Sequence, residues 1–311
     1  MTLQQLHYIV ALDTHRHMGR AAMACFITQP TLSVMLRDLE EELGVKLFDR
    51  SKKPIVPTLS GLRVVEQARA VLKEADLLRT IALEDKDKVE GELRIGIIPT
   101  LAPYLLPLFV PEVLQSHPEL SLRVHEVTTT NIMDQLTQGL LDVGILALPL
   151  NSSGLRETPL FRERFLVYMG ANDPLARKRY VLPMDIDPDR LWLLEEGHCL
   201  RTQVVDLCEL RTHGRGLRRL EFASGSIGSL IRLVDAQGGF TVIPELAMDT
   251  LTPIQRQRVR EFRSPAPLRE IGMVTYRHFV KDRMLEALGK AIHAAVAPRL
   301  NSVRNGRVFA P

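Results

Sequence analysis

The sequence predicts an α/β chain in three parts: a small helical head, one long helix, and a larger part in which strands alternate with helices. Three observations predict this organisation. Apolar residues recur at three- and four-residue spacing within the first 58 residues. Residues 59–83 contain no proline and one glycine. From Leu93 onward, short β-rich runs alternate with helical periodicity, which indicates a parallel sheet flanked by helices.

Bulk properties exclude several classes of protein. The 311 residues suffice for two or three domains. Three cysteines cannot form a disulfide framework, which favours a reducing compartment. Neither a signal peptide nor an apolar run approaching about 18 residues is visible, so we expect a cytoplasmic chain with no membrane partner. The net charge of +3 permits a nucleic-acid partner without requiring one.

The head, residues 1–58, predicts three short helices. An apolar face begins at Leu3, and a second helix covers about Gly19–Cys25, with Cys25 in the core. Thr28 can cap the third helix with Pro30 in its first turn, and Gly44 suits its C-terminal end. Two helices joined by a tight turn, the second offering polar residues from its first turn, form a helix-turn-helix. The start of such a second helix reads base edges in the major groove.

One helix is expected from about Leu59 to Leu83, because apolar residues recur every three or four positions. It would be about 35–40 Å long. A single exposed helix cannot bury such an apolar stripe, so we expect it to pair with a second copy of the chain. The charged run at residues 84–91 then marks a domain boundary.

The remaining residues predict two α/β halves. The first half contains strands at 93–98, 121–127 and 142–148, with helices within 99–118 and 131–139. The second set of strand and helix signals begins at 165–169 and continues through 191–194, 220–223, 227–236 and 240–243. A further strand at 271–276 and a helix at 284–296 close the chain.

Two of the three cysteines, Cys199 and Cys208, lie nine positions apart. Gly197-His198 predicts the start of a helix over roughly 200–210, which places Cys199 near the positive end of the helix dipole, with Arg201 as a nearby cation. The two Cα atoms would then be about 13 Å apart, whereas a disulfide needs about 4.4–6.8 Å. Oxidation of the pair would therefore unwind the helix, as in a redox switch. Alternatively, both cysteines are small buried apolar residues with no redox role.

Several segments of the head resemble the LysR-type transcriptional regulators: Ala21-Ala22, residues 28–33, Leu39-Glu40, Leu43-Gly44, residues 47–50 and residues 57–61. The resemblance implies double-stranded promoter DNA as a partner and a homodimer or homotetramer. It implies a winged helix-turn-helix over 1–58, a linker and dimerisation helix over 59–90, and a two-lobed, periplasmic-binding-protein-like α/β sensor domain over 91–311. Lobe I would comprise about 91–162 and 269–300, and lobe II about 163–268, with hinges near 161–164 and 263–269.

The same resemblance implies which residues meet DNA. The major groove would be contacted by Thr28, Gln29, Pro30, Thr31, Ser33 and Arg37. Arg50, Lys52 and Lys53 would lie at the wing, against phosphate or the minor groove. A solvated helix face is the alternative for each residue, above all for Arg37.

Within this family, residues 195–201 followed by Cys208 resemble the members that sense hydrogen peroxide. The resemblance implies a peroxidatic Cys199, a resolving Cys208 and a thiol reductant that resets the pair. It also implies that peroxide and the thiolate are surrounded by Thr100, Thr129, His198 and Arg269. Alternatively, Thr100 caps the following helix and Arg269 is a surface charge at the hinge. Two features depart from the usual pattern. Thr202 stands in place of an acidic residue, and the loop at 211–219 is unusually basic.

Two other functions remain open. The first is a LysR-type regulator whose cleft binds a small organic effector. The second is a thiol-dependent enzyme, but no Cys-x-x-Cys, dinucleotide-binding glycine motif or phosphate-binding loop supports it, so we expect no enzymatic activity. His7, His15 and His17 have no clustered cysteines nearby, so we expect no metal and no cofactor.

Overall fold

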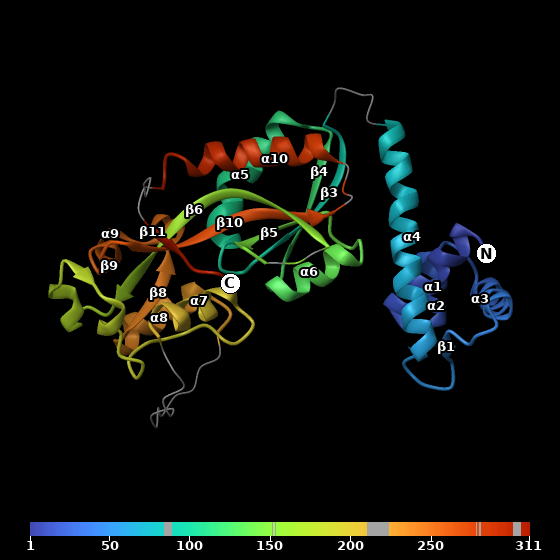
Figure 1. The fold of residues 1–311 in the computed structure, drawn as a ribbon, viewed down its shortest axis with the longest axis horizontal. Helices are drawn as coiled ribbons and strands as arrows, with labels where there is room; N and C mark the ends of the chain where they lie inside the picture. Colours follow the sequence, from blue (N-terminus) through green and yellow to red (C-terminus); the bar gives the residue numbers. More distant parts are fainter. Residues whose placement is uncertain are drawn as a thin grey trace. The chain divides into compact units, whose positions relative to one another are not determined.

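The computed structural model describes residues 1–83, 89–150, 152, 154–209, 224–277, 279, 281–300 and 306–311 (Figure 1). Its contacts divide the chain into an N-terminal unit, Met1–Asp87, and a C-terminal unit, Lys88–Pro311. In the described ranges, no helix combines the length and apolar character that crossing a membrane requires.

The N-terminal unit contains the predicted helix-turn-helix and a wing. Its helices are α1 (Leu3–His15), α2 (Met18–Ala24) and α3 (Gln29–Leu43), and the wing strands β1 (Phe48–Asp49) and β2 (Val56–Pro57) pair antiparallel. Thr28 caps α3, because its hydroxyl accepts a hydrogen bond from the Thr31 N–H. Gly44 ends α3 in the left-handed region, at φ 67°. Cys25 packs half-buried against the apolar core, as expected.

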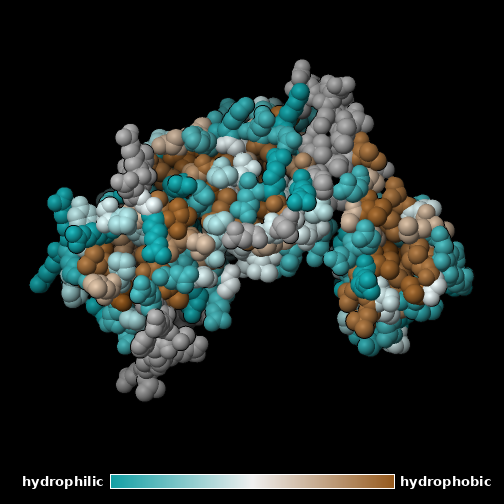
Figure 2. All heavy atoms as spheres, viewed as in Figure 1, coloured by the Kyte–Doolittle hydropathy of each residue, from teal (hydrophilic) through white to brown (hydrophobic). Residues whose placement is uncertain are grey.

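Helix α4 (Leu59–Leu83) has the bounds that the sequence predicts. One face is buried within the N-terminal unit through Val65, Ala68 and Leu72. Four other apolar residues of the helix stay exposed: Leu59, Leu62, Val71 and Leu78. Figure 2 shows brown, apolar surface along this part of the unit. Of the charged run at residues 84–91, which predicts the boundary, residues 84–88 lie outside the described part of the chain.

The C-terminal unit is built on one mixed sheet, in the order β4-β3-β5-β10-β6-β9-β7 (Figure 1). Strands β3 (Gly91–Ile97), β4 (Leu120–Glu126) and β5 (Val143–Leu148) are parallel, as predicted. The sheet as a whole is mixed. Strand β10 (Ala266–Tyr276) returns from the second half of the unit to the first and therefore runs antiparallel to its neighbours β5 and β6 (Leu155–Met169).

Strands β6 and β10 connect the two halves of this unit. The first part of β6 pairs with β10, and its last part pairs antiparallel with β8 (Phe240–Pro244) and β9 (Val259–Phe262). Strand β7 (Tyr180–Val181) adds to β9, and β11 (Gly306–Val308) adds parallel to β10. The expected hinge segments thus map to the middle of β6 and the start of β10.

Helices cover the sheet. They are α5 (Ala102–Ser116), α6 (Thr129–Thr137), α7 (Cys199–Leu207), α8 (Ile227–Gln237), the short α9 (Pro253–Arg256) and α10 (Asp282–Val296). Short 3-10 helices occur at η1 (Pro174–Arg177), η2 (Pro183–Asp185) and η3 (Glu245–Thr250). The segment 191–194 forms only one bridge, between Leu191 and Phe240, and residues 220–223 lie outside the described part of the chain.

Candidate DNA-binding surface and redox site

The start of α3 presents polar side chains to solvent. Gln29, Pro30 and Thr31 are exposed, and Ser33 is half-buried. Thr28 is exposed as well, although its hydroxyl lies 2.9 Å from the hydroxyl of Thr31 and also caps the helix. The first turn of α3, which is the second helix of the helix-turn-helix, is therefore exposed enough to contact bases.

The expected basic residues differ in their surroundings. Arg37 is exposed and lies 3.8 Å from Glu41, one helical turn away. Lys52 and Lys53 lie exposed between the two wing strands, where Lys52 is 3.8 Å from Asp49. Such exposed pairs are weak. All three cations therefore remain available to phosphate.

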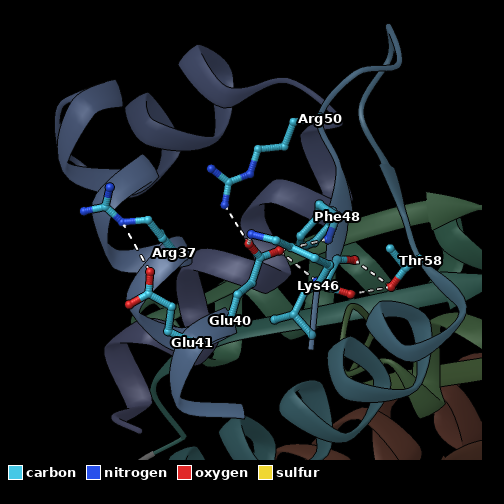
Figure 3. A network of polar contacts seen from close by, with 8 residues as sticks. Arg37, Glu40, Glu41, Lys46, Phe48, Arg50 and Thr58 are labelled. Carbon is cyan, nitrogen blue, oxygen red and sulfur yellow. Dashed lines mark hydrogen bonds and ion pairs between the residues drawn. The ribbon is translucent and has the colours of Figure 1, made fainter. Parts of the chain in front are cut away.

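Buried Glu40 organises the wing (Figure 3). Its Oε1 accepts hydrogen bonds from the Leu47 and Phe48 N–H groups, at 2.8 and 3.2 Å. Its Oε2 lies 2.8 Å from Arg50 Nη2 and 3.4 Å from Lys46 Nζ. Arg50 is therefore held by α3 as well as presented at the wing. Sequence analysis did not identify Glu40 as functional, although it follows the buried Leu39.

Replacing Glu40 by Ala is expected to destabilise the N-terminal unit by roughly 2–3 kcal/mol, because it leaves two backbone N–H groups and Arg50 without their acceptor. Urea unfolding of the full chain measures this loss. Glu41→Ala is the matched control, because Glu41 is exposed and makes only the long ion pair with Arg37. Equal effects of the two substitutions would contradict the role of Glu40.

The predicted helix between the two cysteines is present. Helix α7 begins at Cys199, with His198 as its N-cap, and Cys208 is its C-cap. Gly197 precedes it with φ 93°. Both cysteines are free, with Cys199 buried and Cys208 half-buried. At the helical rise, their Cα atoms are separated by about 13 Å, which no disulfide spans.

The Cys199 thiol lies in an apolar setting with a few polar neighbours. Burial raises its pKa, while Arg269, the Thr129 hydroxyl and the backbone N–H groups at the start of α7 lower it in part. The helix N-terminus therefore acts as expected, but burial outweighs it. Arg201 is not the nearby cation that the sequence indicates, because its guanidinium donates to the Leu194 carbonyl at 2.8 Å. Burial also raises the pKa of Cys208 to about 12.

Arg269 connects this thiol to Thr100. The guanidinium donates from Nη1 to the Thr100 hydroxyl at 3.0 Å and from Nη2 to the Thr100 carbonyl at 3.2 Å. Arg269 is 0% exposed, so the alternative of a surface hinge charge is wrong. Thr100 is buried too and does not cap α5, whose N-cap is Leu101.

Thr129 and His198 contribute differently. Thr129 begins α6, and its buried hydroxyl lies beside the Cys199 thiol, whose pKa it lowers, without a further hydrogen-bond partner among the described residues. A buried hydroxyl with so little hydrogen bonding suits a small polar ligand. His198 is buried, and its Nε2 lies 3.6 Å from Glu195 Oε1. The contacts thus join Cys199, Thr129, Arg269 and Thr100 in one site, with His198 beside it.

The C-terminal segment Gly306–Pro311 reaches α7. Strand β11 pairs with the start of β10, and the Phe309 N–H donates to the Leu268 carbonyl at 2.9 Å. The Gln203 side chain, completely buried one turn after Cys199, donates to the Phe309 carbonyl at 2.8 Å. Sequence analysis missed both residues. The spacing of four between Cys199 and Gln203, which puts them on one helix face, was the available signal.

Deleting residues 306–311 removes this hydrogen bond and is expected to loosen α7. Amide hydrogen exchange over Gln203–Leu207 should accelerate about fivefold, since one buried hydrogen bond contributes about 1 kcal/mol. Exchange in α8 serves as the internal control. Unchanged protection of α7 would show that the C-terminal segment does not stabilise it.

In the described part of the chain, no group of three or more His, Cys, Asp or Glu side chains has the arrangement of a metal site. The wing, the exposed start of α3 and the mixed α/β unit define a DNA-binding regulator. Residues 3–62 match the bacterial regulatory helix-turn-helix proteins of the LysR family, and residues 86–297 match the LysR substrate binding domain. The chain therefore belongs to the LysR family of transcriptional regulators.

Several characterised proteins are similar over nearly the whole chain. Two Escherichia coli relatives, named DNA-binding transcriptional dual regulator OxyR and hydrogen peroxide-inducible genes activator, are 36% identical, with 97% of this chain and 98% of theirs covered. The structure of a full-length OxyR variant from Pseudomonas aeruginosa has a TM-score of 0.79 at 34% identity, covering 94% of this chain and 98% of its own. A peroxide-bound OxyR variant from Corynebacterium glutamicum has a TM-score of 0.64 at 28% identity, covering 99% and 98%.

Proposed function

We propose that this LysR-family regulator binds promoter DNA and senses hydrogen peroxide by oxidation of Cys199, followed by a disulfide with Cys208. One observation carries the proposal. A buried thiol lies beside Arg269 and the buried Thr129 hydroxyl, at the start of a helix that separates it from a second thiol. The names of the Escherichia coli relatives and the peroxide bound to the Corynebacterium protein support the same signal.

The chemistry balances with these two thiols alone. The Cys199 thiolate attacks one peroxide oxygen, the O–O bond breaks, and the departing hydroxide takes a proton to become water. Cys199 is then a sulfenic acid. The Cys208 thiol attacks its sulfur, a disulfide forms, and a second water leaves. A thiol reductant of the cell restores both thiols by exchange.

Polar groups around the thiol would assist the first step. The Thr129 hydroxyl lies beside the Cys199 thiol, makes no hydrogen bond to another described group, and can donate to peroxide bound there. Arg269 holds a positive charge near the sulfur and favours its thiolate over the thiol. Thr100 is bound to that guanidinium, and His198 borders the site. Burial raises the pKa of the thiol and these groups lower it in part, so their placement affects its reactivity.

Disulfide formation would act on the fold through α7. The helix has to unwind, and the hydrogen bond from Gln203 to Phe309 has to break or move. This gives the C-terminal unit two conformations that differ around one segment, which is how a redox switch biases a two-state element. A change in the contacts between copies of this unit would alter the spacing of their DNA-reading units.

We also propose that the chain works as a homodimer or homotetramer. The exposed apolar residues of α4, from Leu59 to Leu78, support pairing of this helix with a second copy. In that assembly, residues 1–58 would read DNA, 59–90 would link copies, and 91–311 would sense the signal. Residues 28–33 and Arg37 would meet the major groove, with Arg50, Lys52 and Lys53 at the wing.

DNA binding tests this function. Duplexes selected from a random pool by the reduced protein would be footprinted with reduced and peroxide-treated protein. We expect peroxide to change the length or position of the protected region, and the Cys199→Ser variant to keep the reduced pattern. Identical footprints for both states of the wild-type protein would contradict peroxide sensing.

A small organic effector is the second candidate, because the buried Thr129 hydroxyl would also suit a hydroxyl or carboxylate ligand. A footprint that changes with a metabolite under reducing conditions, and is insensitive to peroxide, would favour that function.

A further inference from the structure

Glu163 and Arg269 form an ion pair that is completely shielded from solvent. They lie directly opposite each other on the antiparallel strands β6 and β10. Glu163 Oε1 is 2.9 Å from Arg269 Nε and 2.8 Å from Nη2, and both side chains are 0% exposed. Taking two charges out of water costs several kcal/mol per ion, so such a pair adds little to stability. The geometry of the pair therefore indicates that its role is to hold the Arg269 guanidinium in position.

Glu163 and Arg269 each make a further hydrogen bond outside the pair. The second carboxylate oxygen of Glu163 accepts a hydrogen bond from the Leu246 N–H in η3, at 3.0 Å. With its Nε–Nη2 edge held by Glu163, the guanidinium directs Nη1 to the Thr100 hydroxyl. The support thus runs from the η3 backbone through Glu163 to Arg269, and from there to Thr100.

The charge of Arg269 reaches the thiol and lowers the pKa of Cys199. At Tyr104, both act: Arg269 lowers and Glu163 raises a pKa that burial brings to about 12. The positive charge of Arg269 therefore acts on the Cys199 thiol, and both members of the pair lie close to Tyr104.

We propose that Glu163 is a positioning residue, which acts on Cys199 only by holding the Arg269 guanidinium against Thr100, where its charge reaches the thiol. This rests on the proposed role of Cys199 as the reacting thiol. Without the carboxylate, Arg269 is a buried cation whose remaining hydrogen bonds to described residues are those to Thr100, so it turns toward water and leaves the sulfur. A glutamine at position 163 does not replace it, since an amide cannot present acceptors to both Arg269 and the Leu246 N–H.

The chain offers a matched control on the opposite face of the same two strands. Arg162 and Glu270 are also direct neighbours on β6 and β10, and they form an ion pair of 2.8 Å. That pair is partly exposed to solvent, with 59% of the Arg162 side chain accessible. Glu270→Gln therefore removes the same kind of contact from the same strands without touching Arg269.

The test measures the rate at which iodoacetamide alkylates Cys199 as a function of pH, by mass mapping of the reduced full-length protein. Wild type is compared with Glu163→Gln, Arg269→Gln, the double variant and Glu270→Gln. We expect Glu163→Gln to slow alkylation about tenfold at pH 7.5, with its midpoint moved to higher pH. The double variant should be no slower than Arg269→Gln alone, because Glu163 has nothing left to hold. Glu270→Gln should stay within about twofold of wild type.

Three results would overturn the proposal: a midpoint moved to lower pH, no change, or effects of the two substitutions that multiply. If Glu163→Gln does not fold, Glu163→Asp gives the same test, since it keeps the charge but is too short for both contacts. Alkylation needs no peroxide. A wild-type thiol that ignores peroxide would therefore refute the proposed function, while the link from Glu163 to Arg269 is still measured.

Discussion

Replacing Arg269 by Met is expected to lower the free energy of unfolding of the C-terminal unit by about 3–5 kcal/mol, because it leaves the Glu163 carboxylate buried without its partner. The reaction of Cys199 with peroxide should also slow by roughly 10- to 100-fold, since the charge that favours the thiolate is lost. Urea unfolding and stopped-flow oxidation measure the two effects.

Arg162→Met is the control for this substitution. Arg162 pairs with Glu270 on the opposite face of the same strands, but it is exposed. We expect a change of at most about 1 kcal/mol and an unaltered rate at Cys199. An Arg269→Met variant as stable and as reactive as Arg162→Met would contradict the site as described.

Oxidation is expected to abolish amide protection in α7. The helix places the two cysteine Cα atoms about 13 Å apart, so a disulfide between Cys199 and Cys208 cannot form while it persists. Hydrogen exchange of the oxidised protein should accelerate at least about 100-fold over residues 202–207, because this segment changes from a stable helix to an open conformation. Helix α8 should keep its protection.

The Cys208→Ser variant separates the two steps of oxidation. It can form a sulfenic acid on Cys199 but no disulfide, so we expect α7 to stay protected after peroxide treatment. Loss of protection in this variant would mean that oxidation of Cys199 alone opens the helix. Retained protection in the disulfide-linked wild type would contradict the unwinding account.

The sequence predicts the helices of this chain well where residues close in sequence determine their ends. The hydroxyl of Thr28 and the flexible backbone of Gly44 set the ends of α3, and unbroken periodicity gives α4 its bounds. The sheet was less predictable. Whether a strand runs parallel depends on the neighbour it meets, and β10 inserts between β5 and β6 after a long excursion of the chain.

The residues of the candidate site also differ in how well the sequence predicts them. Family resemblance identified Arg269 near the thiol, but the argument from spacing chose Arg201, which two positions along a helix direct away from Cys199. Glu163 meets Arg269 across 106 residues of sequence, and Gln203 meets Phe309 across the same separation. No periodicity encodes such contacts, because they arise only when the two halves of the sheet and the C-terminal segment come together.

Mass spectrometry of the reduced protein after one equivalent of hydrogen peroxide, with free thiols trapped, tests the redox switch most directly. We predict a rapid loss of two hydrogen atoms, mapped to a linkage between Cys199 and Cys208, with Cys25 still free. The Cys199→Ser variant should show no loss. Thiols that stay unmodified in a modest excess of peroxide would contradict the switch and leave a LysR-family regulator whose signal is a small molecule.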